Sequence, residues 1–154
     1  MKNFKLIAKT FTGLENVLCE ELRNLGASNI APGQRAVFFE GNLEMIYKSN
    51  YFLRTAIKIL KEIEFFSFKN VDQFYLKCKK INWTDYFDIS QTFKIESTVV
   101  NSPDFKNSMF ASLRLKDAIA DFFRENAGKR PDVDTENPDF IINQIGRASC
   151  RERV

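Results

Sequence analysis

Six basic or polar residues around one long amphipathic segment have side chains suited to binding phosphate groups. They are Lys106, Asn107, Arg114, Lys116, Lys129 and Arg130. Lysine and arginine bind phosphates by displacing counterions, and an amide near a helix N-terminus can donate to an anion. A guanidinium in the Gly-Lys-Arg-Pro sequence after the segment can contact two oxygens at once. We therefore take these six as candidate contacts to an anionic polymer.

On the pattern alone, a solvated helix face is the simpler interpretation of the same segment. Asp117, Asp121 and Glu125 interleave with its cations, and Asn107 is equally well placed to cap a helix. Five apolar side chains are expected to face a core rather than to stack on bases: Phe110, Leu113, Ile119, Phe122 and Phe123. Both interpretations need a helix over residues 108–125.

The residues that most often carry catalysis or bind metals are few. The chain has no histidine, which excludes Ser-His-Asp and Cys-His arrangements. Asp132 and Asp134 could share a metal, yet no third close ligand supports this, and we expect loop capping and no metal. Three cysteines without CxxC spacing are interpreted as free thiols in a reducing compartment: Cys19, Cys78 and Cys150.

The bulk composition is that of a soluble globular protein. Of 154 residues, 44% are hydrophobic and 28% are charged. No apolar run approaches the roughly 20 residues that a membrane helix needs, and the N-terminus lacks a signal-peptide core. We therefore expect a cytoplasmic protein with no membrane association.

The last ten residues, 145–154 (IGRASCRERV), differ abruptly from the preceding chain. Their sequence resembles the in-frame translation of a sequencing adapter, which would also account for Gln144. We therefore interpret it as a non-native tail and leave it out of the fold prediction, with a genuine basic tail as the alternative. Without its three arginines and one glutamate, the formal charge falls from +3 to +1. Evidence for a nucleic-acid partner must then come from local placement of cations, not from the isoelectric point.

The sequence pattern of residues 1–66 predicts a ferredoxin-like module. Strands are expected at 4–11, near 28–30, at 36–40 and at 57–65, with helices at 13–25 and from 43 to about 56. The order β-α-β-β-α-β is the split unit of that fold. Apolar residues are expected on one face of each helix, including Leu14, Val17 and Leu18 in the first and Leu43 and Tyr47 in the second.

Residues 67–144 predict a second, α/β module. Asn70 can cap a helix that buries Phe74 and Cys78, strands are expected at 92–100 and 139–143, and the helix at 108–125 joins these two strands. A strand-helix-strand succession implies parallel pairing. This module lacks closing strands, so we expect it to be incomplete at its C-terminal end. Phe65, Phe66 and Phe68 are expected to pack the two modules together. Trp83 is expected to pack there as well, with base stacking as its minor alternative.

Five segments in this order resemble the N-terminal part of THUMP-domain RNA methyltransferases, and most nearly the large-subunit ribosomal RNA guanine-N2 methyltransferases. They are TGLENVLCEELRNLGA (12–27), NYFLRTAIKIL (50–60), INWTDYF (81–87), FKNSMFASLRLKDAIADFFRE (105–125) and GKRPDVDTENPDFIIN (128–143). The resemblance covers almost all of residues 1–143. It implies a ferredoxin-like module followed by a THUMP module that binds structured RNA, with 23S ribosomal RNA as the expected partner.

The resemblance also implies a later domain that methylates a base with S-adenosylmethionine. This chain has no Gly-rich loop after a strand and no Asn-Pro-Pro-Tyr motif, so no catalytic or cofactor-binding residue can be assigned, and we expect the chain itself to be inactive. The alternative is a non-catalytic protein-interaction module built on a ferredoxin-like sheet.

Overall fold

The computed structural model describes residues 2–100, 108–147 and 151–153. The chain forms two compact units, divided between Glu62 and Ile63. The division lies four residues before the predicted boundary at 66. The reason is that Phe65–Ser67 pairs with a strand of the second unit, whereas the last strand of the first unit ends at Lys61.

The first unit is a four-stranded antiparallel sheet with two helices. In chain order its elements are β1 (Phe4–Lys9), α1 (Glu15–Asn24), β2 (Ser28–Pro32), β3 (Ala36–Gly41), α2 (Leu43–Phe52) and β4 (Lys58–Lys61). The strands lie in the order β2-β3-β1-β4, and every neighbouring pair is antiparallel. This arrangement confirms the predicted ferredoxin-like module.

Local signals begin and end these helices as predicted. The Asn42 side chain accepts a hydrogen bond from the Met45 amide at 2.9 Å and so caps α2. Gly26 follows α1 with φ +84°, the left-handed conformation that lets the chain leave a helix.

The predicted apolar faces of these helices were partly wrong. α1 buries Leu18, Cys19 and Leu22, but Val17 is exposed. In α2 the buried side chains are Met45 and Ser49, whereas Leu43, Tyr47 and Tyr51 are exposed on another face. The predicted apolar positions Leu43 and Tyr47 therefore do not mark the buried face of α2.

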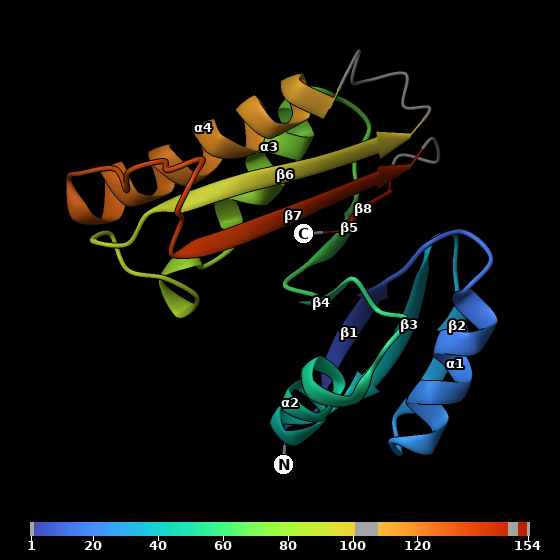
Figure 1. The fold of residues 1–154 in the computed structure, drawn as a ribbon. Helices are drawn as coiled ribbons and strands as arrows, with labels where there is room; N and C mark the ends of the chain where they lie inside the picture. The colour runs from blue at the N-terminus through green and yellow to red at the C-terminus, as the bar shows by residue number, and fades with distance from the viewer. Residues whose placement is uncertain (1, 101–107, 148–150, 154) are drawn as a thin grey trace. The chain divides into compact units, whose positions relative to one another are not determined.

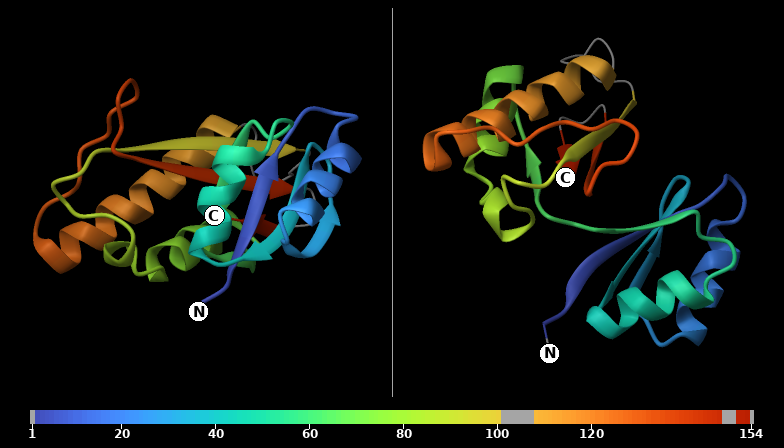
Figure 2. Two further views of the ribbon diagram at one scale, coloured as in Figure 1. Left: turned by 60° about the horizontal axis from the view of Figure 1, so that its bottom comes forward. Right: turned by 60° about the vertical axis from the view of Figure 1, so that its left-hand side comes forward.

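The second unit is a mixed sheet covered on one face by two helices. Its elements are β5 (Phe65–Ser67), α3 (Val71–Lys80), a 3₁₀ turn η1 (Trp83–Asp85), β6 (Phe93–Val100), α4 (Ser108–Ala127), β7 (Phe140–Arg147) and β8 (Arg151–Arg153). The strand order is β5-β8-β7-β6. β6 and β7 are parallel, as predicted, and the other pairs are antiparallel. Figures 1 and 2 show α3 and α4 on the same face of the β6–β7 pair.

Part of the predicted tail belongs to this sheet. β7 continues through Arg147, and β8 pairs with both β5 and β7. Main-chain pairing does not depend on side-chain identity, and two strand edges offer open amides and carbonyls to any segment that reaches them. Gln144, which the adapter sequence would also explain, is buried, and its Oε1 accepts from the Ser97 hydroxyl at 2.8 Å.

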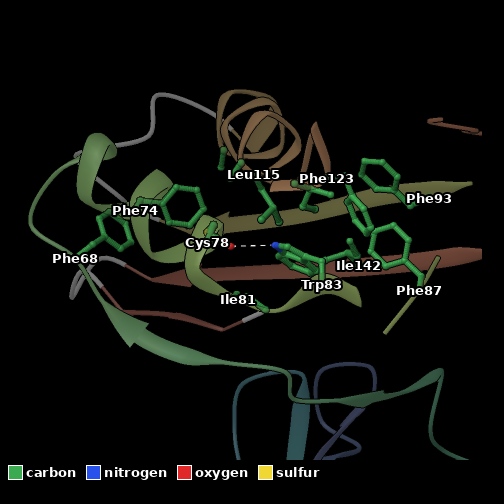
Figure 3. Packing of buried hydrophobic residues seen from close by; sticks show 13 residues of the cluster. Phe68, Phe74, Cys78, Ile81, Trp83, Phe87, Phe93, Leu115, Phe123 and Ile142 are labelled. Carbon is green, nitrogen blue, oxygen red and sulfur yellow. Dashed lines mark hydrogen bonds between the residues drawn. The ribbon is translucent and has the colours of Figure 1, made fainter. Parts of the chain in front are cut away.

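Trp83 lies at the centre of the second core. Its side chain is fully buried and packs edge-on against Phe87, while its Nε1 donates to the Cys78 carbonyl at 3.0 Å (Figure 3). Phe68 is buried in the same core, and Phe66 packs against it. Trp83 is therefore a packing residue of this unit, and its burial leaves no ring face for a base. Cys19 and Cys78 are buried free thiols, as predicted.

Within the described residues, no helix is long and apolar enough to span a membrane. No group of three or more cysteine, aspartate or glutamate side chains there has the arrangement of a metal site.

Substituting Trp83 by alanine should destabilise the second unit by about 3–5 kcal/mol, because it removes a large buried ring and leaves a cavity. Urea unfolding followed by far-UV circular dichroism measures the loss. Tyr51→Ala is the control, since Tyr51 is 83% exposed and its removal should change stability by at most about 0.5 kcal/mol. Equal unfolding midpoints for the two variants would contradict the burial of Trp83.

Candidate nucleic-acid interface

α4 carries two of the four predicted contact residues that the structure describes, Arg114 and Lys116. It buries five side chains against the sheet and α3: Ala111, Leu115, Ala118, Ile119 and Phe123. The predicted burial of Ile119 and Phe123 is correct, and Phe122 packs at the edge of this core. Phe110 and Leu113 were assigned to the core wrongly, because they are 41% and 44% exposed. Small alanines occupy the core-facing positions instead.

Three polar contacts join α3 to one flank of α4. The Tyr75 hydroxyl donates to Asp121 at 2.5 Å, and Lys79 forms an ion pair with Glu125 at 2.5 Å. The third contact is the ion pair between Arg114 and Asp72, described below. Asp121 and Glu125 thus bind partners on α3, although Asp121 also pairs with the exposed Arg124 of α4 at 3.2 Å. Asp117 is exposed, so part of the solvated helix face remains.

Arg114 belongs to this α3–α4 contact. Its Nη2 lies 3.4 Å from Asp72 Oδ1, and its guanidinium carbon lies 5.0 Å from the centroid of the Tyr75 ring. Its side chain is 28% exposed, and within the described residues its buried Nε has no hydrogen-bond partner. Arg114 therefore packs helices together and presents only part of its guanidinium to a ligand.

Lys116 lies on the other flank of α4. Two residues correspond to about 200° of rotation around a helix, so Lys116 points away from the side occupied by Arg114. One turn earlier, the Ser112 hydroxyl donates to Ser97 on β6 at 2.7 Å, which places this flank over β6. Among the residues the structure describes, Lys116 forms no ion pair.

Lys129 and Arg130 lie in a short exposed segment that is fixed at both ends. Gly128 has φ +69°, and its amide bonds to the Arg124 carbonyl at 3.0 Å as α4 ends. Beyond the segment, the Phe93 amide at the start of β6 donates to the Asp132 carbonyl at 3.1 Å. Neither cation has an ion-pair partner in the described part of the chain.

The six predicted residues therefore do not form one cluster. Lys106 and Asn107 lie outside the described residues. Lys116 is separated from the Lys129–Arg130 segment by about 18 Å of helix, at 1.5 Å per residue. Such a spread suits contacts along a polymer backbone and not a small-molecule pocket.

Of the two loop carboxylates that were predicted to cap, Asp134 binds main-chain amides. Asp134 accepts from the amides of Glu136 at 2.9 Å and Asn137 at 3.1 Å, and these bonds lower its pKa. The predicted capping role of this residue is confirmed. Sequence reasoning missed Tyr75 and Asp72 as partners of Arg114, because the contact joins residues about 40 positions apart and leaves no local pattern.

Comparison with known proteins identifies the domain families to which this chain belongs. The THUMP domain profile matches residues 68–144, and the RlmL ferredoxin-like domain profile matches residues 5–60. The chain therefore belongs to the THUMP-domain family and carries the ferredoxin-like domain ahead of THUMP. The THUMP match ends where the predicted tail begins.

Named relatives make the comparison more specific. The chain is 34% identical over 139 residues to the Ribosomal RNA large subunit methyltransferase K/L of Syntrophotalea carbinolica, covering 90% of this chain and 19% of that protein. The protein of the same name from Pseudomonas paraeruginosa is 37% identical over 131 residues, covering 85% and 18%. The chain thus spans about a fifth of the length of these curated relatives.

A solved relative shares the arrangement of elements. The structure of SMU.472 in complex with SAH is 26% identical and superposes with a TM-score of 0.82, covering 99% of this chain and 41% of that one.

The contact between Tyr75 and Asp121 should make stability depend on pH. The bond to the Asp121 carboxylate, with help from burial, raises the pKa of Tyr75 above its ordinary value of 10.0. The folded state therefore retains this proton at a pH where the unfolded state loses it. The stabilisation is fully present below about pH 10 and is lost as pH rises through the folded pKa.

Tyr75→Phe should thus lower the free energy of unfolding at pH 8 by about 1 kcal/mol. The difference in the free energy of unfolding between this variant and the parent chain should become smaller above about pH 10.5. Urea titrations at both pH values test this, with Tyr51→Phe as the matched control. A gap that stays constant with pH would show that the hydroxyl does not bond to Asp121.

Proposed function

We propose that this chain is the RNA-binding portion of an S-adenosylmethionine-dependent methyltransferase that acts on large-subunit ribosomal RNA. Its role is to hold structured RNA so that a catalytic domain in the rest of the longer protein reaches the target base. The methylated group is the N2 amine of a guanine in 23S ribosomal RNA, and the protein works in the cytoplasm. S-adenosylmethionine is the cofactor of the whole protein and is not bound by this chain.

The proposal is supported by the two domain matches taken together with the placement of exposed cations on the THUMP unit. Both domains match in order, and their curated relatives are named as ribosomal RNA methyltransferases. The exposed cations of the THUMP unit, Lys129 and Arg130, and the partly exposed Lys116 lie apart from the acids that bind α3. Structured RNA is recognised mostly through its backbone and shape, which suits dispersed cations.

Each lysine or arginine that meets a phosphate contributes to affinity and to its salt dependence. Lys116 and Arg130 lie on opposite sides of the gap of about 18 Å along α4. A helical RNA can span this gap, and each contact then releases its own counterion. The two residues should therefore act nearly independently on binding.

Lys116→Ala and Arg130→Ala should each weaken binding to a ribosomal RNA hairpin by several-fold at low salt. Each should also make the fall of log affinity with log salt concentration less steep, by about 0.7–0.9 in the slope. Fluorescence anisotropy over a KCl series from about 50 to about 300 mM measures both quantities, because phosphate contacts weaken steeply over this range.

The control is Lys48→Ala, since Lys48 is exposed on α2 and pairs with Glu44 at 2.7 Å. If the parent chain does not bind the hairpin at the lowest salt concentration, the RNA proposal fails and the protein-interaction alternative takes its place. If Lys116→Ala and Arg130→Ala behave like Lys48→Ala, the RNA contacts lie elsewhere.

A further inference from the structure

α2 carries an apolar surface on the side opposite its buried residues. Met45 and Ser49 face the core of the first unit. On the outer side, Leu43, Tyr47 and Tyr51 follow one another at intervals of four residues, which places them in one row along the helix. Their side chains are 56%, 68% and 83% exposed. Contiguous exposed apolar surface of this kind marks an interaction site.

A further ring extends this row at the C-terminal end of α2. Phe52 is 56% exposed, and its ring meets that of Tyr51 edge-on, with 4.9 Å between the ring centroids. We call Leu43, Tyr47, Tyr51 and Phe52 the α2 face. Tyrosine and phenylalanine are enriched at the centre of protein interfaces, because they bury a large area and lose little side-chain entropy. The α2 face therefore suits a protein partner.

The charges beside the α2 face cancel. Glu44 and Lys48 are the only charged residues of α2, and they form an ion pair at 2.7 Å. The helix thus has no excess of positive charge to attract a polyanion, and no excess of either sign to repel a copy of itself. A surface that binds its own copy across a two-fold axis must be self-complementary in this way.

An antiparallel pair of α2 helices meets this requirement in one register. If the two-fold axis passes beside Tyr47, the two Tyr47 rings meet, and Leu43 of each copy faces Tyr51 of the other. Glu44 of one copy then lies about 3 Å along the helix axis from the level of Lys48 of the other. Both residues are on the same side of the helix pair. The two ion pairs within the helices can therefore become two ion pairs between the copies.

The size of the α2 face agrees with a weak pair of this kind. The exposed fractions of its four side chains correspond to roughly 500 Å² per copy, or about 1,000 Å² per pair. A specific interface between two proteins buries at least about 1,000 Å² in total. The α2 face is at this lower limit, so we expect the pair to form at micromolar and higher concentrations.

We propose that the α2 face binds a second copy of the chain, with the two α2 helices antiparallel about a two-fold axis beside Tyr47. The face contains none of the residues assigned to RNA, so this contact is additional to the RNA-binding function. The rings of Tyr47, Tyr51 and Phe52 supply the buried area. Glu44 and Lys48 set the register and the direction of the partner helix.

Sedimentation equilibrium of the 154-residue chain tests the proposal. A reductant is present, because oxidised cysteines would also join copies. Between about 5 and about 500 µM, the average mass should rise from 17.9 kDa toward twice that value.

The variant Tyr47→Gln with Tyr51→Gln should raise the dissociation constant of the pair at least about tenfold, because it removes the two most exposed rings of the face. Glutamine is a good helix former, so α2 is retained. The control is Phe11→Gln with Val17→Gln, which removes apolar side chains that are 60% and 48% exposed elsewhere on the same unit. The control should associate like the parent chain.

A charge exchange tests the register. Lys48→Glu should weaken the pair several-fold, because like charges then face each other between the copies. Glu44→Lys with Lys48→Glu should restore association, since opposite charges again face each other. Far-UV circular dichroism of each variant checks that the helices are retained.

Three results would overturn the proposal. A mass of 17.9 kDa at every concentration would leave the α2 face to another occupant, such as the rest of the longer protein. If the folded variant Tyr47→Gln with Tyr51→Gln associates as the control does, the contact between copies lies elsewhere. If the charge exchange associates no better than Lys48→Glu, the antiparallel register is wrong. RNA binding is tested separately, by the salt titrations of Lys116→Ala and Arg130→Ala.

Discussion

The parallel pairing of β6 and β7 is the constraint on which the second unit depends. Parallel neighbours cannot be joined by a tight turn, so the chain must cross over, and α4 is that crossover. The register runs without a break from Phe93 with Phe140 to Val100 with Arg147, which fixes both ends of the helix against the sheet. As a result the cations near the start of α4 and those after its end lie far apart. The unit presents an extended flank and not a pocket.

Both units use their acids in the same way. In the second unit, Asp121 and Glu125 bind donors on α3. In the first, Glu15 and Glu21 bind loop amides. These carboxylates keep their charge, but their hydrogen bonds hold each of them at one place in its own unit. A chain whose formal charge is only +3 can therefore still present local positive surfaces.

Local signals allowed much of the fold to be predicted. Asn42, Asn70 and Gly26 occupy the predicted cap and stop positions, and the β-α-β-β-α-β order and the parallel pair are correct. The rotation of α4 was not predictable in the same way. Phe110 and Leu113 give a stronger apolar signal than Ala111 and Ala118, yet alanine is what allows a helix to lie close to a sheet. The bonds of Glu15 to the Arg35 amide and of Glu21 to the Arg54 amide gave no signal, because loop residues have no periodicity and the partners lie 20 and 33 positions apart.

The most direct test of the central claim is lysine footprinting of the chain with and without a ribosomal RNA hairpin. Acylation of each lysine is measured by mass spectrometry at low salt. If the RNA backbone lies along the flank of α4, Lys116 and Lys129 should become protected while Lys48 on α2 stays reactive. Unchanged labelling of Lys116 and Lys129 on an RNA-saturated chain would contradict the account.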